Sequence, residues 1–334
     1  MKISVALCTY NGALFLEEQL KSIAQQTRVP DEMIILDDQA TDATVEIARS
    51  VCARYQLNAA ISVNEVRLGV EKNFSRAMCK ATGDVIFFCD QDDVWGPHKV
   101  EKMVAPFQAD QGVALVYSDG YIVGPQLKPT GETLFSWAPK KCLQDGDQRD
   151  VGALLRYGHA PGIKASAVAF AAWVRDLAGP LPEGVAHDSW IAFFGYALGK
   201  VVVINEPLYS YRRHEQTSGK SSTNELISGL QAGKRSTPAF TLQDKVHFAQ
   251  CVYDRMCWLE REIGKTVSLT SRFYEMKRDA QEAERTLKAR KAIRNRSGII
   301  PRVCQGIHAL VKGDYIAIKG YRAKLQELGK DLKG

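Results

Sequence analysis

The chain lacks the long apolar segments of membrane-spanning proteins. No apolar run approaches the ~20 residues that a transmembrane helix needs, so we expect no membrane span. The N-terminal segment Met1–Cys8 leads directly into polar Asn11 and Gly12, where a signal peptide would continue with a longer apolar stretch. We therefore expect this segment to be the first strand of the fold.

Cysteines are few, and none of the eight lies in a Cys-x-x-Cys pair. This spacing disfavours the common zinc and dithiol motifs. Several of the cysteines lie in apolar runs that are typical of core positions. Reduced thiols in a cytoplasmic protein are the expectation that follows.

Composition and charge give different pictures of the chain. With 334 residues, 45% of them hydrophobic and 25% charged, it has the composition of a folded globular protein. The net charge of +6 is unevenly placed: residues 1–233 carry 22 Lys and Arg against 27 Asp and Glu, whereas residues 234–334 carry 22 against 11. The charges are thus −5 and +11, which predicts a basic C-terminal region with its own partner, such as an anionic surface. No nucleic-acid-binding motif accompanies this charge, so we expect no nucleic-acid partner.

Strand and helix patterns alternate over the first 120 residues. Apolar runs predict strands at residues 3–7, 33–36, 59–63, 85–89 and 113–117. Periodic segments predict helices at residues 14–26, 43–55, 70–81 and 98–109. Continuous apolar strands separated by amphipathic helices indicate a parallel, doubly wound, Rossmann-like α/β sheet with helices on both faces.

The second half of the chain is less regular. Residues 121–164 are rich in Gly, Pro and polar residues and predict a long excursion. Strands are expected at 166–170 and 201–204, with a short helix at 188–197 between them. From residue 240 onward the pattern is helical and charged, most clearly at 272–296.

Polar residues follow three of the predicted strands, as Thr9-Tyr10-Asn11, Asp37-Asp38 and Asp90-Gln91-Asp92. In a doubly wound sheet, ligands bind beyond the carboxyl ends of the strands, so we expect these segments to converge on one crevice. Asp90 and Asp92 offer hard oxygen ligands suited to Mg²⁺ or Mn²⁺, although solvated or capping carboxylates also occur in such loops. Asp38 either belongs to a turn or accepts a hydrogen bond from a nucleotide, and Tyr10 is either a turn residue or a base-stacking ring.

Taken in order, these segments resemble a known family. The resemblance rests on Thr9-Tyr10-Asn11-Gly12, Ser22–Thr27, Asp37–Thr44, Gly69 with Asn73-Phe74, Gly83-Asp84 and Asp90–Trp95. They look like the nucleotide-sugar domain of glycosyltransferase family 2, whose members are inverting and have the GT-A fold, over residues 1 to about 215. Gln39 and Ala40 depart from the family's usual Gly and Ser, which affects the contacts of that loop rather than the class.

The resemblance implies roles for the residues of the donor site. Tyr10 would stack on the base and Asp38 would bind its polar edge, while Asp92 would bind the divalent metal that neutralises the diphosphate. Asp90 would face the ribose or the metal. Further donor-binding residues implied in the same way are Thr9, Asn11, Asn73, Arg212 and His214.

An inverting transfer also needs a base to take a proton from the acceptor hydroxyl. The resemblance assigns this role to Asp188, which from the residues alone could equally cap a helix. On the acceptor side we expect Trp190 and His159. His187 either contacts the acceptor, orients Asp188 or is an ordinary structural histidine.

The resemblance also suggests a substrate class. The Gln-x-x-Arg-Trp segment of the family's processive synthases is absent, which favours a single-addition enzyme. Lys312–Tyr315, Tyr321 and Lys330–Leu332 are similar to the ending of bacterial rhamnosyltransferases, which points to dTDP-L-rhamnose as donor, with a UDP-sugar as the other possibility. The acceptor would be a glycan or lipid-linked saccharide of a surface polysaccharide such as O-antigen, core or capsule.

The expected organisation is a GT-A catalytic domain over residues 1–233, with a nucleotide-sugar half at 1–120 and an acceptor half at 121–233, followed by a helical basic region at 234–334. That region would hold a cytoplasmic enzyme at the inner face of the plasma membrane or bind a diphosphate-linked lipid acceptor, and the alternative is a helical subdomain with a solvated basic face. The competing interpretations are a nucleotidyltransferase, disfavoured because no Gly-rich, Lys-bearing loop lies near the N-terminus, and an inactive glycan-binding relative, disfavoured by the three carboxylates Asp90, Asp92 and Asp188.

Overall fold

The structure, a computed structural model, describes residues 1–137, 164–214, 242–262 and 271–294. The chain divides into two compact units. Of the described residues, 1–137 and 164–214 belong to the first unit, and 242–262 and 271–294 belong to the second. The candidate site lies in the first unit.

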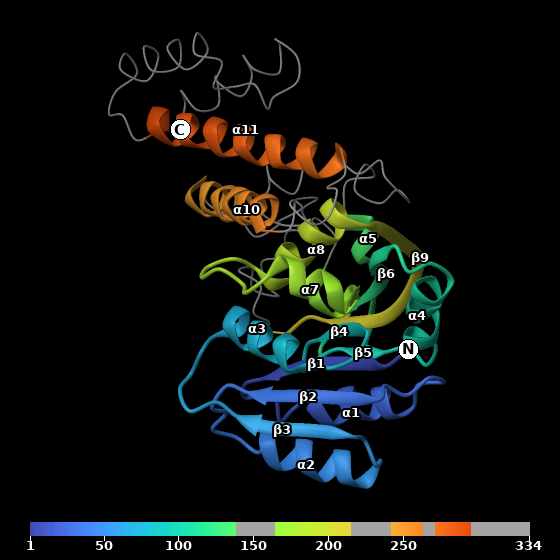
Figure 1. Ribbon diagram of the computed structural model, residues 1–334. Coiled ribbons are helices and arrows are strands. Elements are labelled where there is room, and N and C mark those ends of the chain that lie inside the picture. The colour runs from blue at the N-terminus through green and yellow to red at the C-terminus, as the bar shows by residue number, and fades with distance from the viewer. Residues whose placement is uncertain (138–163, 215–241, 263–270, 295–334) are drawn as a thin grey trace. The chain divides into compact units, whose positions relative to one another are not determined.

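The first unit begins with alternating strands and helices (Figure 1). These elements are β1 (Ile3–Thr9), α1 (Leu16–Ala24), β2 (Glu32–Asp37), α2 (Thr44–Arg54), β3 (Ala59–Val63), α3 (Val70–Lys80) and β4 (Val85–Cys89). All residues of β1 and β4 are buried, and the four strands pair in parallel. The continuous apolar runs therefore form the interior strands that the sequence predicts.

The chain reverses direction across the sheet after β3. The strand order begins β3-β2-β1-β4, so the chain first moves outward from β1 to β3 and then returns past β1 to β4. Because parallel crossovers are right-handed, this reversal places α1 and α2 on one face and α3 on the other. Consistently, α1 packs against α2, whereas α3 packs with the later helix α8 (His187–Leu198). The predicted helices on both faces are confirmed (Figure 1).

The remaining strands extend the sheet on the β4 side. The elements are β5 (Val94–Trp95), α4 (Lys99–Ala109), β6 (Val113–Val123), β7 (Pro129–Thr133), α5 (Leu134–Trp137), a 3₁₀ turn (Ala165–Ala167), β8 (Val168–Ala171), α7 (Ala172–Ala178), α8 and β9 (Lys200–Arg212). The full order is β3-β2-β1-β4-β8-β6-β9-β5, with β7 paired to β6. Strand β8 runs antiparallel to both β4 and β6, so the sheet is mostly rather than entirely parallel.

Two predicted elements differ in length from the structure. Strand β6 continues to Val123 and pairs with β7, so the first part of the predicted excursion is a hairpin. Residues 138–163 of that excursion, including His159, lie outside the described residues. Strand β9 extends to Arg212 because its second half pairs with β6 and β5, although its sequence is interrupted by Pro207. Tyr211 and Arg212 therefore lie on the strand rather than after it.

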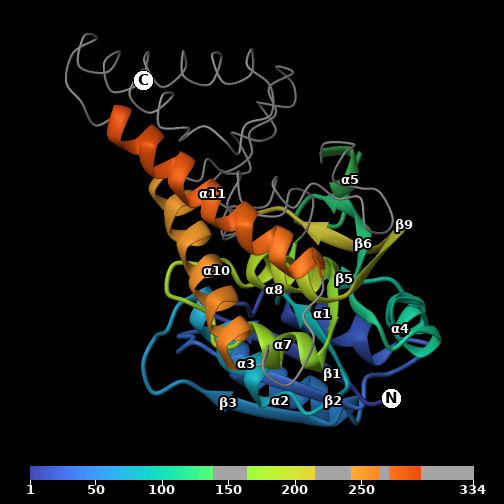
Figure 2. The same ribbon diagram turned by 45° about the horizontal axis from the view of Figure 1, so that its top comes forward.

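The second unit contains the helices α10 (Leu242–Glu262) and α11 (Ser271–Arg294), which lie side by side (Figure 2). Their buried residues recur at intervals of three and four, as a pair of packed helices requires. These are Phe248, Val252, Met256 and Leu259 on α10, and Phe273, Met276, Ala280, Ala283 and Leu287 on α11. None of the helices in the described part of the chain is both long and apolar enough to span a membrane.

Candidate active site

The ends of β1 and β2 are tied together by buried hydrogen bonds. Thr9 Oγ1 donates to Asp37 Oδ2 over 2.7 Å, and the Asp38 backbone N–H donates to the Thr9 carbonyl over 2.8 Å. Asp37 also accepts from the Ala40 N–H over 2.7 Å, which closes the turn after β2. Thr9 is 3% exposed. We therefore interpret Thr9 as a support of the strand ends rather than as the direct donor contact that the resemblance implies.

Asp38 is the centre of a loop-organising network. Its Oδ1 accepts from Asn64 Nδ2 over 2.9 Å and from the Leu68 N–H over 2.7 Å, and its Oδ2 accepts from the Gly69 N–H over 2.8 Å. A carboxylate has about four acceptor positions, so these three donors leave room for one more. The carboxylate thus orders the segment before α3 and keeps capacity for a further N–H donor.

Asn73 and Asn11 also bond within the chain. The buried Asn73 amide donates from Nδ2 to the Leu36 carbonyl over 2.9 Å, and its Oδ1 accepts from Asn64 over 2.8 Å. Asn11 has a left-handed backbone, with φ of 48°, and its Oδ1 accepts from the Thr41 N–H over 2.8 Å. We therefore interpret Asn73 as a structural support for the Asp38 loop, which revises the direct donor contact implied above.

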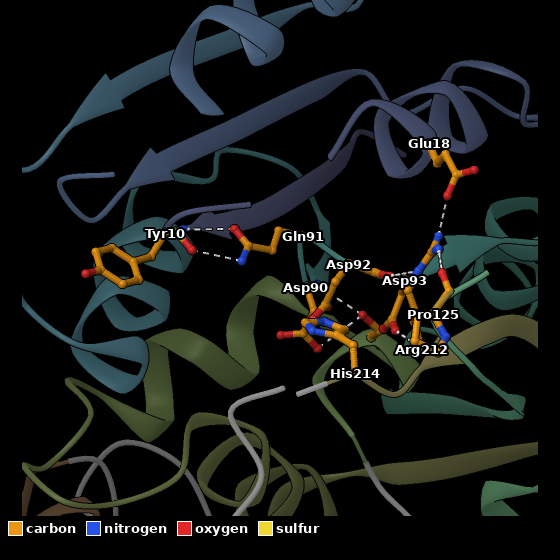
Figure 3. Close-up of polar contacts among 10 residues, drawn as sticks. Tyr10, Glu18, Asp90, Gln91, Asp92, Asp93, Pro125, Arg212 and His214 are labelled. Atoms are coloured by element: carbon orange, nitrogen blue, oxygen red, sulfur yellow. Dashed lines mark hydrogen bonds and ion pairs between the residues drawn. The ribbon is translucent and has the colours of Figure 1, made fainter. Parts of the chain in front are cut away.

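Tyr10 is fixed in place through its backbone. Gln91 Oε1 accepts from the Tyr10 N–H over 2.9 Å, and Gln91 Nε2 donates to the Tyr10 carbonyl over 3.0 Å (Figure 3). Gly12 is required beside this pair, because a Cβ there would lie 2.2 Å from Gln91 Oε1. The clamp leaves the half-buried Tyr10 ring directed away from the carboxylates, where the exposed Arg67 guanidinium lies 3.9 Å from its centroid. Sequence reasoning missed Arg67, since no periodicity or motif marked it.

Three carboxylates gather immediately after β4. Burial, together with the charges of Asp92 and then Asp188, raises the pKa of Asp90 to about 7. Burial and the charges of Asp92 and Asp90 likewise raise the pKa of Asp93, which is fully buried and accepts from the Arg212 N–H over 3.0 Å. Such crowding of acidic groups favours a bound cation.

His214 joins this cluster from the segment just after β9. Its Nε2 lies 2.8 Å from Asp92 Oδ2, and its ring packs against Phe15 with centroids 4.5 Å apart (Figure 3). The two residues are 122 positions apart in the sequence. The structure therefore brings together Asp92 and His214, which the sequence assigned to metal and donor binding.

Arg212 has a buried, structural environment. Its guanidinium donates to the Asp92 carbonyl over 2.7 Å, the Pro125 carbonyl over 2.5 Å and Glu18 Oε2 over 2.5 Å, and it lies over the Phe15 ring (Figure 3). The side chain is 2% exposed. These contacts fix the Asp92 backbone, so we interpret Arg212 as a support of the carboxylate loop rather than as a phosphate-binding group.

Asp188 lies in the first turn of α8, where the helix dipole favours a negative charge. Its Oδ1 accepts from the Ser189 N–H over 2.6 Å and from Ser189 Oγ over 3.1 Å. Its charge is among the causes of the raised pKa of Asp90, after burial and the charge of Asp92, although the two carboxylates come from separate elements. Helix α8 thus carries a fourth carboxylate whose charge acts on the cluster after β4.

The acceptor-side predictions are revised in part. His187 is buried, with its ring stacked on Phe74 at 4.0 Å and edge-on to Phe88 at 5.0 Å. Burial lowers the pKa of His187 and so favours the neutral imidazole. Trp190 is 1% exposed and packs on Phe194 with centroids 4.8 Å apart, so it is a core residue rather than an acceptor contact. His159 lies outside the described residues.

Comparison with known proteins identifies the family. Residues 4–169 match the family model described as Glycosyl transferase family 2. The chain is a family 2 glycosyltransferase. It is 29% identical over 251 residues to an uncharacterized glycosyltransferase of Nostoc, covering 71% of this chain and 73% of that protein. It is also 38% identical over 103 residues to the dTDP-rhamnosyl transferase RfbG of Shigella flexneri, covering 29% of this chain and 35% of RfbG.

Solved structures support the fold of this glycosyltransferase. The structure of S. aureus TarS 1-349 in complex with UDP-GlcNAc matches with a TM-score of 0.56 at 16% identity, covering 100% of this chain and 91% of that one. The predicted α/β GT-A fold with a mostly parallel sheet and C-terminal helices is confirmed. The family assignment decides against the nucleotidyltransferase alternative.

Proposed function

We propose that this glycosyltransferase moves a sugar from a nucleotide-sugar donor to an acceptor hydroxyl in one displacement step that inverts the anomeric carbon. The observation that carries the proposal is the gathering of Asp90, Asp92 and His214 after β4, with the charge of Asp188 acting on Asp90 from α8. Asp188 takes the proton of the acceptor hydroxyl as its oxygen bonds to the anomeric carbon. The bond from that carbon to the diphosphate oxygen breaks, and its electron pair leaves with the nucleoside diphosphate.

The residues present fit a divalent cation of the Mg²⁺ or Mn²⁺ type. The cluster after β4 offers carboxylate oxygens from Asp90 and Asp92 and a ring nitrogen from His214, and burial together with the charges of Asp92 and Asp188 raises the pKa of Asp90 to about 7. In the described ranges no three acidic, His or Cys side chains form a complete metal site, so further ligands would come from diphosphate and water, as is common for Mg²⁺. When bound, the cation offsets charge that develops on the departing diphosphate.

Tyr10 and Asp38 are the proposed nucleoside-binding residues. Tyr10 offers a ring held by the Gln91 clamp, and Asp38 keeps acceptor capacity for an N–H of the base. Asn11 joins the loop after Tyr10 to the loop after Asp38, because its Oδ1 accepts from the Thr41 N–H. The diphosphate would then extend toward Asp92 and His214 on the other side of Gln91, as the arrangement in Figure 3 suggests.

We infer that the donor is dTDP-L-rhamnose and that the acceptor is a glycan or lipid-linked saccharide of a bacterial surface polysaccharide. Support for the donor comes from the similarity to RfbG, which spans 103 residues of this chain. A UDP-sugar is the competing donor, since TarS was solved with UDP-GlcNAc. Release of free sugar from a panel of dTDP-, UDP- and GDP-sugars distinguishes the two donors.

The experiment that tests the proposed reaction is the substitution Asp188→Asn. It removes the base but keeps size and polarity, so transfer falls by at least ~10²-fold, the lower end of the usual contribution of a general base. Nucleoside diphosphate affinity, measured by calorimetry with Mn²⁺, stays within about twofold, because the donor residues lie on other elements. The matched control is Glu183→Gln, which alters an exposed carboxylate just before the same helix. Transfer by the Asp188 variant at the wild-type rate would exclude this base.

A further inference from the structure

Ser166 is a buried hydroxyl that holds Asp90 at two points. It lies in the 3₁₀ turn before β8, and it is fully buried. Its Oγ accepts from the Asp90 backbone N–H over 3.0 Å and donates to Asp90 Oδ2 over 3.2 Å. A single side chain therefore fixes both the backbone at the end of β4 and the carboxylate that follows it.

Ser166 is itself held from behind by Lys99. The Lys99 ammonium donates to the Ser166 carbonyl over 2.7 Å and lies 4.4 Å from the Tyr209 ring centroid and 5.1 Å from that of Trp95. Lys99 is fully buried at the start of α4, and a buried ammonium is retained only where hydrogen bonds or opposite charges offset its lost hydration. Burial lowers the pKa of Lys99 to about 7, and the nearby charges of Cys89 and Asp93 oppose that shift.

The position of this pair relative to the acidic cluster argues against a purely local role. Lys99 is a fully buried cation near Asp93, whereas the side chains of Asp92 and His214 retain 16% and 9% exposure. Ser166 connects Lys99 with the acidic cluster, because its carbonyl contacts Lys99 and its hydroxyl contacts Asp90. Ser166 thus holds a carboxylate on which the charges of Asp92 and Asp188 act.

We propose that Ser166 is a positioning residue that orients the Asp90 carboxylate toward a divalent cation and the donor diphosphate, and that Lys99 fixes Ser166 for this purpose. The inference rests on the proposed function, because it concerns the same site. It adds two residues, from the 3₁₀ turn before β8 and from α4, that neither the motif Asp90–Asp92 nor the comparisons mark. The competing explanation is that Ser166 only joins β8 to β4 and affects stability alone.

The test is Ser166→Ala, with calorimetric titration of UDP and dTDP in Mn²⁺ and in EDTA. The variant removes both hydroxyl contacts but keeps the carbonyl that Lys99 binds, so the protein is expected to fold. Loss of a hydrogen bond to a charged group predicts about tenfold weaker nucleotide binding in Mn²⁺. Affinity in EDTA is expected to stay unchanged, so the effect appears only with the cation. A structural role would instead lower the melting temperature and leave the affinity in Mn²⁺ unaltered, which overturns the proposal.

The matched control is Ser118→Ala, which removes another fully buried serine hydroxyl, on β6. It is expected to leave nucleotide affinity unchanged in both buffers. The wild-type titrations distinguish failure of the proposed function from failure of the role of Ser166. If nucleotide binding by the wild type does not depend on Mn²⁺, both fail. If the wild type depends on Mn²⁺ and Ser166→Ala behaves like Ser118→Ala, only the role of Ser166 fails.

Discussion

Gln39 shows how a residue that breaks a family pattern can keep the pattern's geometry. It stands where the resemblance expects glycine, and its φ of 64° lies in the left-handed region that glycine adopts without strain. Its Nε2 donates to the Glu65 carbonyl over 2.5 Å, which links the turn after β2 to the segment after β3. The loop around Asp38 is therefore preserved, at the expense of backbone strain at one residue.

We predict that Gln39→Val lowers the free energy of unfolding by about 2 kcal/mol, because a β-branched side chain adds crowding to a left-handed backbone and removes the contact with Glu65. Gln39→Gly is the control and is expected to stay within about 1 kcal/mol of the wild type, since relief of strain offsets the lost hydrogen bond. Urea denaturation followed by fluorescence measures both. Equal midpoints for the Val and Gly variants would show that the strain at this position is negligible.

Not every role expected at the residue scale survives in the structure. Tyr10, Asp92 and Asp188 are half-buried. Asp92 belongs to the carboxylate cluster, the charge of Asp188 acts on Asp90, and Tyr10 is held by Gln91. Thr9 and Trp190 are instead buried, and their type and position in the sequence did not reveal this. A polar residue after a strand can face a ligand or close the turn, and only the position of its hydrogen-bond partners distinguishes the two.

At the scale of elements, the end of β4 determines where the acidic side chains of the site gather. Its five buried residues end at Cys89, so Asp90 begins the first segment that can reach solvent. Asp90 remains close to Asp92 and Asp188, and burial together with these charges raises its pKa to about 7. In the unfolded chain its pKa returns to the ordinary value of about 4. The folded state therefore binds the Asp90 proton more tightly than the unfolded state does between about pH 4 and 7.

This difference predicts a pH-dependent effect of Asp90→Asn. Since the folded state holds more protons in that window, the contribution of Asp90 to stability falls as the pH rises. The Asn variant lacks this loss, so its melting temperature should equal that of the wild type near pH 5 and exceed it near pH 8, in EDTA. Mn²⁺ with UDP should raise the melting temperature of the wild type more than that of the variant. A constant difference between the two proteins from pH 5 to 8 would contradict the shifted pKa.

Strand lengths show which elements could be predicted. Strands β3 and β4 match their predicted bounds, because each is a short apolar run between polar turns. Strand β9 runs past Asn205-Glu206-Pro207, a segment typical of a strand end, because β6 and β5 supply pairing partners on either side. Pairing between distant segments thus overrides the local signal. The two-residue strand β5 has no local signal of its own.

At the scale of the whole molecule, the uneven charge corresponds to a helical second unit. On helix α11, exposed residues recur at intervals of three and four and so form a stripe along one face. This stripe includes three basic residues, Arg278, Arg285 and Lys288. Its buried residues face α10 instead. We propose that this stripe, with the rest of residues 234–334 at net charge +11, holds the enzyme against the anionic inner face of the plasma membrane.

We predict that reversing the three charges, with Arg278→Glu, Arg285→Glu and Lys288→Glu combined, weakens binding to vesicles of anionic lipid. Each basic residue near such a surface contributes about 1 kcal/mol, so the loss is about 3 kcal/mol or more, over a hundredfold in affinity. Flotation with phosphatidylglycerol vesicles measures it, and neutral phosphatidylcholine vesicles should bind neither protein. The matched control reverses three exposed basic residues of the first unit, Lys21, Arg49 and Lys128. Equal flotation of the two variants would remove the α11 stripe as the binding surface.

The sequence by itself determined the alternating architecture, the carboxylate-bearing strand ends and the family, because apolar periodicity and short ordered motifs are local properties of the chain. Only the tertiary structure decided which polar residues face a ligand and which support them. Arg212, Ser166 and Lys99 act through partners 67 or more positions away, and no local pattern encodes such contacts. The same holds for the pairing of Asp92 with His214, which exists because β9 crosses the sheet beside β6 and ends next to the loop after β4.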